Sequence, residues 1–163
     1  MMGSGKTSVG RLLADWLGVR LHDIDATIEY EAGCGIPEIF ERRGEAHFRE
    51  LEREAIARAV RGRPCVIATG GGAFVDPGNR RALKAGGIVI YLRASAERLA
   101  ERVRRTRKRP LLRDADPLAR IRELLAEREA AYREADHVID TDALRVDEVV
   151  ARILDLPSVR AAC

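Results

Sequence analysis

The sequence opens with Met1-Met2-Gly3-Ser4-Gly5-Lys6-Thr7, and a helical pattern begins at Ser8. The stretch is most of the phosphate-binding pattern G-x-x-x-x-G-K-[ST]. In that pattern glycine N–H groups surround phosphate oxygens, a lysine reaches the β- and γ-phosphates and a hydroxyl ligates Mg²⁺. The positive end of the following helix faces the same anion. The stretch therefore predicts a nucleotide-binding loop, although the first glycine of the pattern and the strand that delivers such a loop would both precede Met1.

Composition indicates one globular domain that spans residues 1–163. The chain is 46% hydrophobic and 34% charged, with a net charge of +3 and a pI near 9.0. The positive balance favours anionic partners such as nucleotides or carboxylates. No apolar run is long enough to cross a bilayer, and no signal-peptide pattern is evident. The three widely spaced cysteines suggest neither a disulfide framework nor a zinc site, so we expect reduced thiols in a cytoplasmic protein.

Hydrophobic periodicity alternates between helices and strands along the chain. Strands are predicted over 19–24, 65–68, 88–92 and 137–139, and helices over 7–17, 27–32, 37–44, 45–60, 77–85, 95–105, 117–134 and 146–156. This alternation is typical of an α/β fold, in which helices cover both faces of a parallel sheet. Trp16 and Tyr91 are expected in the core.

Asp23 and Asp25 end the first predicted strand, two residues apart, so both carboxylates should project to the same side. Ligands of open α/β sheets collect at the carboxyl ends of strands. Beside a phosphate-binding loop, Asp23 could join the Mg²⁺ shell and Asp25 could accept a hydroxyl proton. The alternative is one helix N-cap and one solvated acid.

Charged residues also interrupt two apolar helical stripes. Glu52 lies in the line Phe48, Glu52, Ala55 and Ala59, with Arg49 three residues before it. Arg128 lies in the line Leu118, Ile121, Leu125, Arg128 and Tyr132. Arg49 and Arg128 together would suit a carboxylate, whereas an ordinary ion pair and a snorkelling arginine are the alternatives.

Two loops complete the predicted site. Gly70-Gly71-Gly72 directly follows a buried strand, where glycines permit close approach and offer bare N–H donors to an anion. Arg109 lies in a basic loop between two helices and could close over phosphates as part of a lid at about 106–117. A solvated basic run or a nucleic-acid patch with Arg98, Arg102, Arg104 and Arg105 is the alternative.

Taken in order, these motifs resemble the shikimate kinase family from Met1 to about Leu156. They are Gly3-Ser-Gly-Lys-Thr7, Asp23-Ile-Asp25, Gly44-Glu-x-x-Phe-Arg49 with Glu52, Gly70-Gly-Gly72, Arg109-Pro-Leu-Leu112 and Arg128-x-x-x-Tyr132-Arg133. The resemblance implies a three-layer α/β/α P-loop kinase fold with a parallel sheet in the order 2-3-1-4-5, strand 1 being absent from this chain. It also implies transfer of a phosphoryl group from ATP to the 3-hydroxyl of shikimate, in chorismate and aromatic amino acid biosynthesis.

The resemblance assigns a role to each motif. Lys6, Asp25 and Arg109 would be catalytic, and Thr7 and Asp23 would hold Mg²⁺. The nucleotide would contact Gly3, Ser4, Gly5, Lys6, Thr7, Ser8, Arg105, Arg109 and Arg145. Shikimate would contact Asp25, Arg49, Gly70, Gly71, Gly72 and Arg128, with Glu52 orienting Arg49. The cofactors would be ATP and Mg²⁺, and shikimate would be the small-molecule substrate. The chain would bind neither nucleic acid nor a membrane, and it would be a monomer.

Three alternatives remain open at this point. The chain could be another small-metabolite P-loop kinase, similar to a gluconate kinase. It could be a basic nucleic-acid-binding module, or a truncated and inactive form. Since loss of the central strand would expose two strand edges, we expect the natural start to lie roughly ten residues upstream, about one strand and the first glycine.

Overall fold

The computed structural model describes residues 1, 3–104 and 116–162. Arg105, Arg109 and all of the predicted lid except its last two residues, 116 and 117, lie outside the described residues.

The described chain alternates helices and strands, as predicted. The strands are β1 (Arg20–Asp23), β2 (Cys65–Ala68), β3 (Ile90–Arg93) and β4 (His137–Asp140). The helices are α1 (Lys6–Leu17), α2 (Ile24–Ala32), α3 (Ile36–Arg61), η1 (Ala73–Val75, a 3₁₀ turn), α4 (Pro77–Gly86), α5 (Ala96–Arg104), α6 (Pro117–Tyr132), α7 (Val146–Leu154) and α8 (Pro157–Ala162). None of these helices has the length and apolar content needed to span a bilayer.

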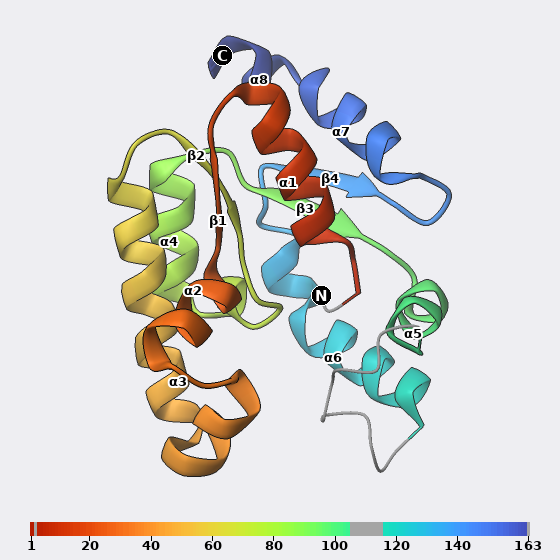
Figure 1. The fold of residues 1–163 in the computed structure, drawn as a ribbon. Coiled ribbons are helices and arrows are strands. Elements are labelled where there is room, and N and C mark those ends of the chain that lie inside the picture. The colour runs from red at the N-terminus through yellow and green to blue at the C-terminus, as the bar shows by residue number, and fades with distance from the viewer. Residues whose placement is uncertain (2, 105–115, 163) are drawn as a thin grey trace.

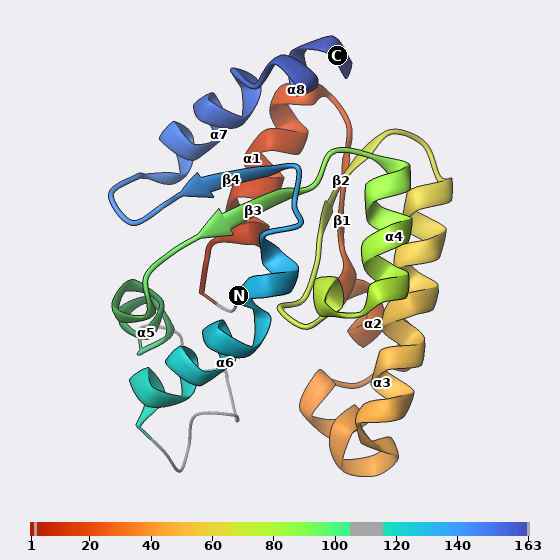
Figure 2. The same cartoon turned by 180° about the vertical axis from the view of Figure 1, so that it is seen from behind.

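The strands form two parallel pairs (Figure 1). β1 pairs with β2 so that Arg20 lies opposite Cys65, and β3 pairs with β4 so that Ile90 lies opposite His137. These are the pairs that the order 2-3-1-4-5 leaves when strand 1 is absent, so the predicted topology is confirmed. Seen from behind, β3 and β4 lie above the N-terminus, and β1 and β2 lie to the right of them (Figure 2).

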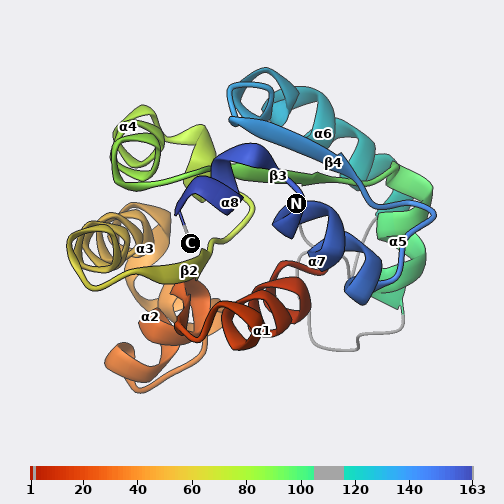
Figure 3. The same ribbon diagram turned by 90° about the horizontal axis from the view of Figure 1, so that it is seen from above.

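Helices cover both faces of this divided sheet (Figure 3). On one face α1 and α7 form an apolar cluster with Leu92 and Ile139. On the other face Tyr91 packs with α5 and α6, and Ile67 packs with α2 and α3. Because neighbouring strand residues such as Tyr91 and Leu92 enter different clusters, β3 is buried on both faces, as expected for a parallel sheet.

Local chemistry accounts for where several elements begin and end. The α1 helix ends at Gly18, which adopts the left-handed conformation with φ 64°. The long helix α3 contains a kink at Gly44, where φ is 78°, so the two helices predicted over 37–44 and 45–60 meet without a loop. Pro77 and Pro117 stand in the first turns of α4 and α6, each after an aspartate whose side chain caps the helix.

Three expectations were wrong in detail, and one helix was missed. Helix α2 begins at Ile24 rather than at residue 27, because the Asp23 carboxylate accepts the Ala26 N–H and caps it. Strand β3 begins at Ile90 and not at residue 88 as predicted, because the Val89 N–H donates to the Asp136 carboxylate and not to the carbonyl of a neighbouring strand. Trp16 is 71% exposed and not in the core, whereas Tyr91 is buried as expected. Helix α8 was not predicted.

Candidate active site

The phosphate-binding loop lies at the N-terminus of α1. Gly3 and Gly5 have φ values of 73° and 83°, and Gly5 is the N-cap of the helix. Such backbone angles are accessible to glycine without strain. The Lys6 ammonium donates to the Met1 carbonyl oxygen at 2.6 Å and lies 3.5 Å from the Ser4 hydroxyl. The lysine is therefore folded back over the loop, where the phosphates of a nucleotide would lie.

The pair predicted to hold the metal is in direct contact. The Thr7 hydroxyl donates to the Asp23 carboxylate at 2.7 Å. Thr7 stands in the first turn of α1 and Asp23 ends β1, so both oxygens lie at the carboxyl edge of the sheet. Hydroxyl and carboxylate oxygens suit Mg²⁺, which normally takes one or two protein ligands together with substrate phosphates and water. The residues therefore fit the ion that the sequence predicts.

Asp25 reaches the site by a different route from the one predicted. It lies in the first turn of α2 and not in a strand, so strand alternation does not bring it to the side of Asp23. Its carboxylate instead lies against the glycine run. A methyl group built on Gly70 would be 2.7 Å from Asp25 Oδ1 and 3.2 Å from Glu52 Oε1. The structure thus brings Asp25, Glu52 and Gly70 together.

Arg49 is held by two carboxylates of its own helix. Its guanidinium donates to Glu52 at 2.8 Å and to Glu45 at 2.9 Å and 3.2 Å. The Phe48 ring lies beside it, 5.3 Å from Arg49 Cζ. The Glu52 contact was predicted, and the Glu45 contact was missed although its i, i+4 spacing is typical of helical ion pairs. Fixed in this way, the arginine loses little conformational freedom when it binds an anion.

Gly72 provides the space that Arg49 occupies. A methyl group on Gly72 would lie 2.6 Å and 2.7 Å from the two terminal nitrogens of Arg49. A contact under 3 Å forces something to move, and both carboxylate partners hold this guanidinium in place. The glycine run therefore leaves room for the Arg49 side chain, in keeping with the close approach predicted from the sequence, while N–H donation to an anion stays a prediction.

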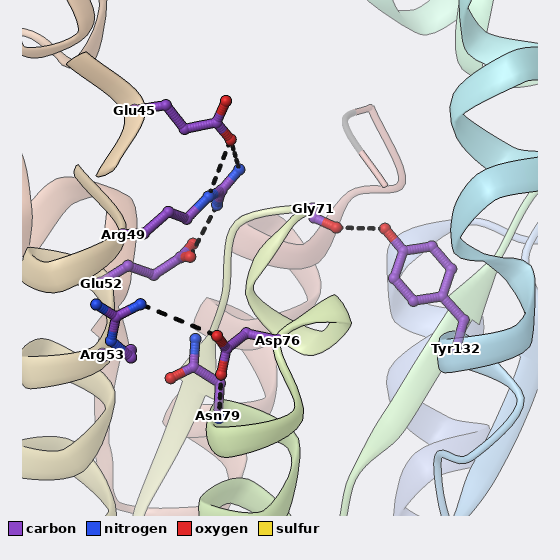
Figure 4. Close-up of polar contacts among 8 residues, drawn as sticks. All are labelled: Glu45, Arg49, Glu52, Arg53, Gly71, Asp76, Asn79 and Tyr132. Atoms are coloured by element: carbon purple, nitrogen blue, oxygen red, sulfur yellow. Dashed lines mark hydrogen bonds and ion pairs between the residues drawn. The ribbon is translucent and has the colours of Figure 1, made fainter. Parts of the chain in front are cut away.

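Arg128 lies on the other side of the run. The Tyr132 hydroxyl donates to the Gly71 carbonyl oxygen (Figure 4). The Arg128 side chain lies beside that hydroxyl and lowers the pKa of Tyr132. Burial of Tyr132 has a larger effect in the opposite direction, so the pKa of Tyr132 is raised overall. Arg128 also contacts the Met1 sulfur at 3.9 Å. Tyr132 belongs to the predicted Arg128-x-x-x-Tyr132 motif, but no local pattern indicated its bond to Gly71.

Glu52 is the buried centre of the site, with no exposed surface. Burial raises the pKa of its carboxyl group, against the opposing effect of the Arg49 ion pair. Its second oxygen, Oε1, has no hydrogen-bond partner among the described residues, and the same is true of the amide nitrogen of buried Asn79. Asn79 lies on α4, beneath Glu52 in Figure 4, where the Asp76 side chain accepts its backbone N–H.

The structure gives less support to the nucleotide contacts predicted for Ser8 and Arg145. Ser8 is exposed on α1. Arg145 precedes α7, where its guanidinium pairs with Asp147 and its N–H bonds Glu148. The contacts found for Arg145 among the described residues thus lie within the first turn of α7, and a role in adenine binding stays a prediction. The described part of the chain holds no group of three or more His, Cys, Asp or Glu side chains that could bind a metal by themselves.

Comparison with known proteins agrees with this geometry. A family model described as "Shikimate kinase" matches residues 2–157. The chain belongs to the shikimate kinase family. Among curated members, the shikimate kinase of Ruegeria pomeroyi is 48% identical over 155 residues, which is 94% of this chain and 80% of the relative. That of Pseudomonas syringae pv. tomato is 48% identical over 161 residues, covering 96% and 94%.

Solved members of the family share the fold. A shikimate kinase from Acinetobacter baumannii in complex with shikimate superposes with a TM-score of 0.89 at 41% identity, covering 94% of this chain and 86% of that one. The enzyme from Bacteroides thetaiotaomicron gives a TM-score of 0.88 at 30% identity, covering 95% and 93%. These matches confirm the three-layer fold and the family predicted from the motifs, and they do not favour a gluconate kinase or a nucleic-acid-binding module.

Proposed function

We propose that this chain is a shikimate kinase that transfers the γ-phosphoryl group of ATP to the 3-hydroxyl of shikimate, giving shikimate 3-phosphate and ADP. The observation that carries the proposal is the glycine run 70–72, which lies between Arg49 on one side and Tyr132 with Arg128 on the other, with Asp25 against Gly70. A relative with 41% identity is described in complex with shikimate.

The phosphate-binding loop would hold the nucleotide. Lys6 would exchange its bond to the Met1 carbonyl for the β- and γ-phosphates, while the N–H groups of the loop and the N-terminal end of α1 face the same anion. Thr7 and Asp23 would hold Mg²⁺, which when bound neutralises charge on the phosphates.

The two arginines would bind the carboxylate of shikimate. Arg49 already has two acidic partners, which keep its guanidinium in one orientation over Gly72. Arg128 would close the clamp from α6. A carboxylate held by charged donors on both sides fixes the ring, and therefore places its hydroxyl groups relative to Asp25 and the loop.

Asp25 would position the 3-hydroxyl and accept its proton. A bond forms between that oxygen and the γ-phosphorus as the bond to the bridging oxygen of ADP breaks. A carboxylate is by nature a weak base for an alcohol. In a loose phosphoryl-transfer transition state the proton leaves late, so positioning and charge neutralisation supply most of the rate. Arg109, which lies outside the described residues, is proposed to add positive charge from the lid.

The proposal is tested by shikimate-dependent release of ADP from ATP by this chain. A substrate panel with shikimate, quinate and gluconate measures specificity, and Lys6→Met supplies the inactive control. We expect ADP release with shikimate and a requirement for Mg²⁺. Release with gluconate but not with shikimate would overturn the proposal.

A further inference from the structure

The glycine run forms a tight turn. The Ala73 N–H donates to the Gly70 carbonyl oxygen at 3.3 Å, so residues 70–73 make a β-turn with Gly71 and Gly72 at its centre. Gly72 has φ −90° and ψ −21°, the angles of the third position of a type I turn. A type II turn would need a positive φ at Gly72, and glycine accepts either sign without strain. The sequence therefore permits both turn types at this place.

The two turn types differ in the direction of the peptide group between Gly71 and Gly72. Changing one type into the other rotates this group by about half a turn, because ψ of the first central residue and φ of the second both change. No peptide bond of the described chain is cis, so the Gly71 carbonyl and the Gly72 N–H point in opposite directions. A contact that fixes the carbonyl therefore also decides where the Gly72 N–H points.

The Tyr132 hydroxyl makes such a contact. It donates to the Gly71 carbonyl oxygen from α6, on the side of the run away from Arg49 (Figure 4). The Gly72 N–H accordingly points away from Tyr132, toward the side on which the Arg49 guanidinium approaches Gly72. Among the described residues this N–H has no hydrogen-bond partner. Within that part of the chain it is therefore a donor left for a ligand.

Other contacts hold Tyr132 and the glycine run at a fixed separation. Tyr132 is 4% exposed, and its ring packs on that of Tyr91 with the centroids 4.8 Å apart. Two positions after Tyr132, Glu134 pairs with Arg80 at 2.9 Å. Arg80 also donates to two carbonyl oxygens of η1, at 3.0 Å and 3.1 Å. Since η1 directly follows the glycine run, Arg80 ties the end of α6 to the turn.

Arg128 acts on the same hydroxyl. Burial raises the pKa of Tyr132, and the positive charge of Arg128 beside the hydroxyl opposes that effect. A cation at this place makes the O–H group more acidic, and therefore a stronger donor to the Gly71 carbonyl. The hydroxyl thus connects one arginine of the proposed carboxylate clamp to the turn.

We propose that Tyr132 is a positioning residue for shikimate, because its bond to the Gly71 carbonyl keeps the turn in the type I form and so directs the Gly72 N–H at the substrate. The inference rests on the proposed function, since it takes shikimate as the ligand between Arg49 and Arg128. Without the hydroxyl the peptide group can turn over, and the N–H then faces α6 and is lost to the ligand.

Tyr132→Phe tests the role, because it removes the hydroxyl and keeps the ring beside Tyr91. The matched control is Tyr91→Phe, which removes the other hydroxyl of the ring pair; that hydroxyl lies 3.4 Å from Glu129 and not at the glycine run. In ¹⁵N NMR spectra of the unliganded chain, the amide signal of Gly72 should move much further in Tyr132→Phe than in Tyr91→Phe. This measurement reports on the turn and does not depend on catalysis.

Steady-state kinetics measure the effect on the substrate. The KM for shikimate should rise roughly tenfold in Tyr132→Phe, as expected for the loss of one hydrogen bond, while the KM for ATP stays within about twofold. Both KM values of Tyr91→Phe should stay within about twofold of those of the unmodified chain. Circular dichroism checks that both variants fold.

Two outcomes would overturn the proposal. An unchanged Gly72 signal in Tyr132→Phe would mean that the hydroxyl does not set the turn. A displaced signal with an unchanged KM for shikimate would mean that the turn does not serve the substrate. Failure of the proposed function looks different: the unmodified chain then releases no ADP with shikimate, whereas the Gly72 signal still responds to Tyr132→Phe.

Discussion

The Thr7 hydroxyl and the Asp23 carboxylate are 2.7 Å apart, although sixteen positions separate them in the sequence. Asp23→Asn tests whether this contact serves a metal. Asparagine is as good an N-cap as aspartate, so α2 should keep its cap and the melting temperature should change little. The Mg²⁺ concentration for half-maximal activity should rise roughly tenfold or more, because an amide binds the ion more weakly than a carboxylate does.

The control for this variant is Asp15→Asn, an exposed change on α1. The metal role would be refuted if Asp23→Asn lowered the melting temperature while leaving the Mg²⁺ requirement unchanged.

Asp25→Asn should lower kcat by about 10²- to 10⁴-fold, with much smaller changes in the KM values. The reason is that the amide can still position a hydroxyl but cannot accept its proton. Coupled measurement of ADP release gives both constants. Turnover equal to that of the unmodified chain would exclude Asp25 as the base.

Arg128→Ala should raise the KM for shikimate roughly 10- to 100-fold, and that for ATP far less, because a charged hydrogen-bond donor to the carboxylate is lost. Arg120→Ala is the matched control, since Arg120 is on the same helix but exposed and paired with Glu123. Equal increases in both KM values would argue against a carboxylate clamp.

Gly72→Ala should raise the KM for shikimate by about tenfold or more, because the new methyl group would lie 2.6 Å from an Arg49 nitrogen and displace the guanidinium. Gly87→Ala is the control: a methyl group there would have nothing within 4 Å, and the backbone of Gly87 is extended. If both variants bind shikimate normally, the close approach of Gly72 has no part in recognition.

Glu52→Gln should change how stability depends on pH. Burial raises the pKa of Glu52 in the folded state, so the native protein binds this proton more tightly than the unfolded chain does. The stability of the unmodified chain relative to the variant should therefore be greatest below the unfolded pKa of about 4.3, and should fall as the pH rises through the folded pKa.

Urea unfolding at several pH values across this window measures the effect, with Glu54→Gln as the control because Glu54 is exposed on the same helix. A stability difference that does not vary with pH, or that grows as the pH rises, would contradict the prediction.

Much of the fold follows from local pattern. The continuous apolar run of β2 predicted a parallel strand, although only Ala68 of its four residues is fully buried, and Gly18 marked the end of α1. Trp16 could not be placed in the same way, since its side chain lines a hollow beside β2 and β3, whose shape depends on how two distant strand pairs are arranged. Long-range arrangement of this kind has no local signature.

The site also combines contacts that local spacing predicts with contacts that depend on long-range packing. Spacing within one helix predicted the contact of Arg49 with Glu52, because residues three apart on a helix are neighbours. The strand argument for Asp25 was wrong, since the cap at Asp23 starts a helix one residue later. The bond from Tyr132 to Gly71 joins residues 61 positions apart, and only packing of α6 against the glycine run creates it.

Trp16 is the chain's single tryptophan, and it is 71% exposed at the border of the hollow between the two strand pairs. An indole that is already in contact with water changes its emission little when a protein unfolds. Trp16 fluorescence should therefore be a poor measure of denaturation and a sensitive optical reporter of whatever enters the space between the strand pairs. The side chain that core packing does not use thus gives the molecule a built-in probe, free of any attached dye.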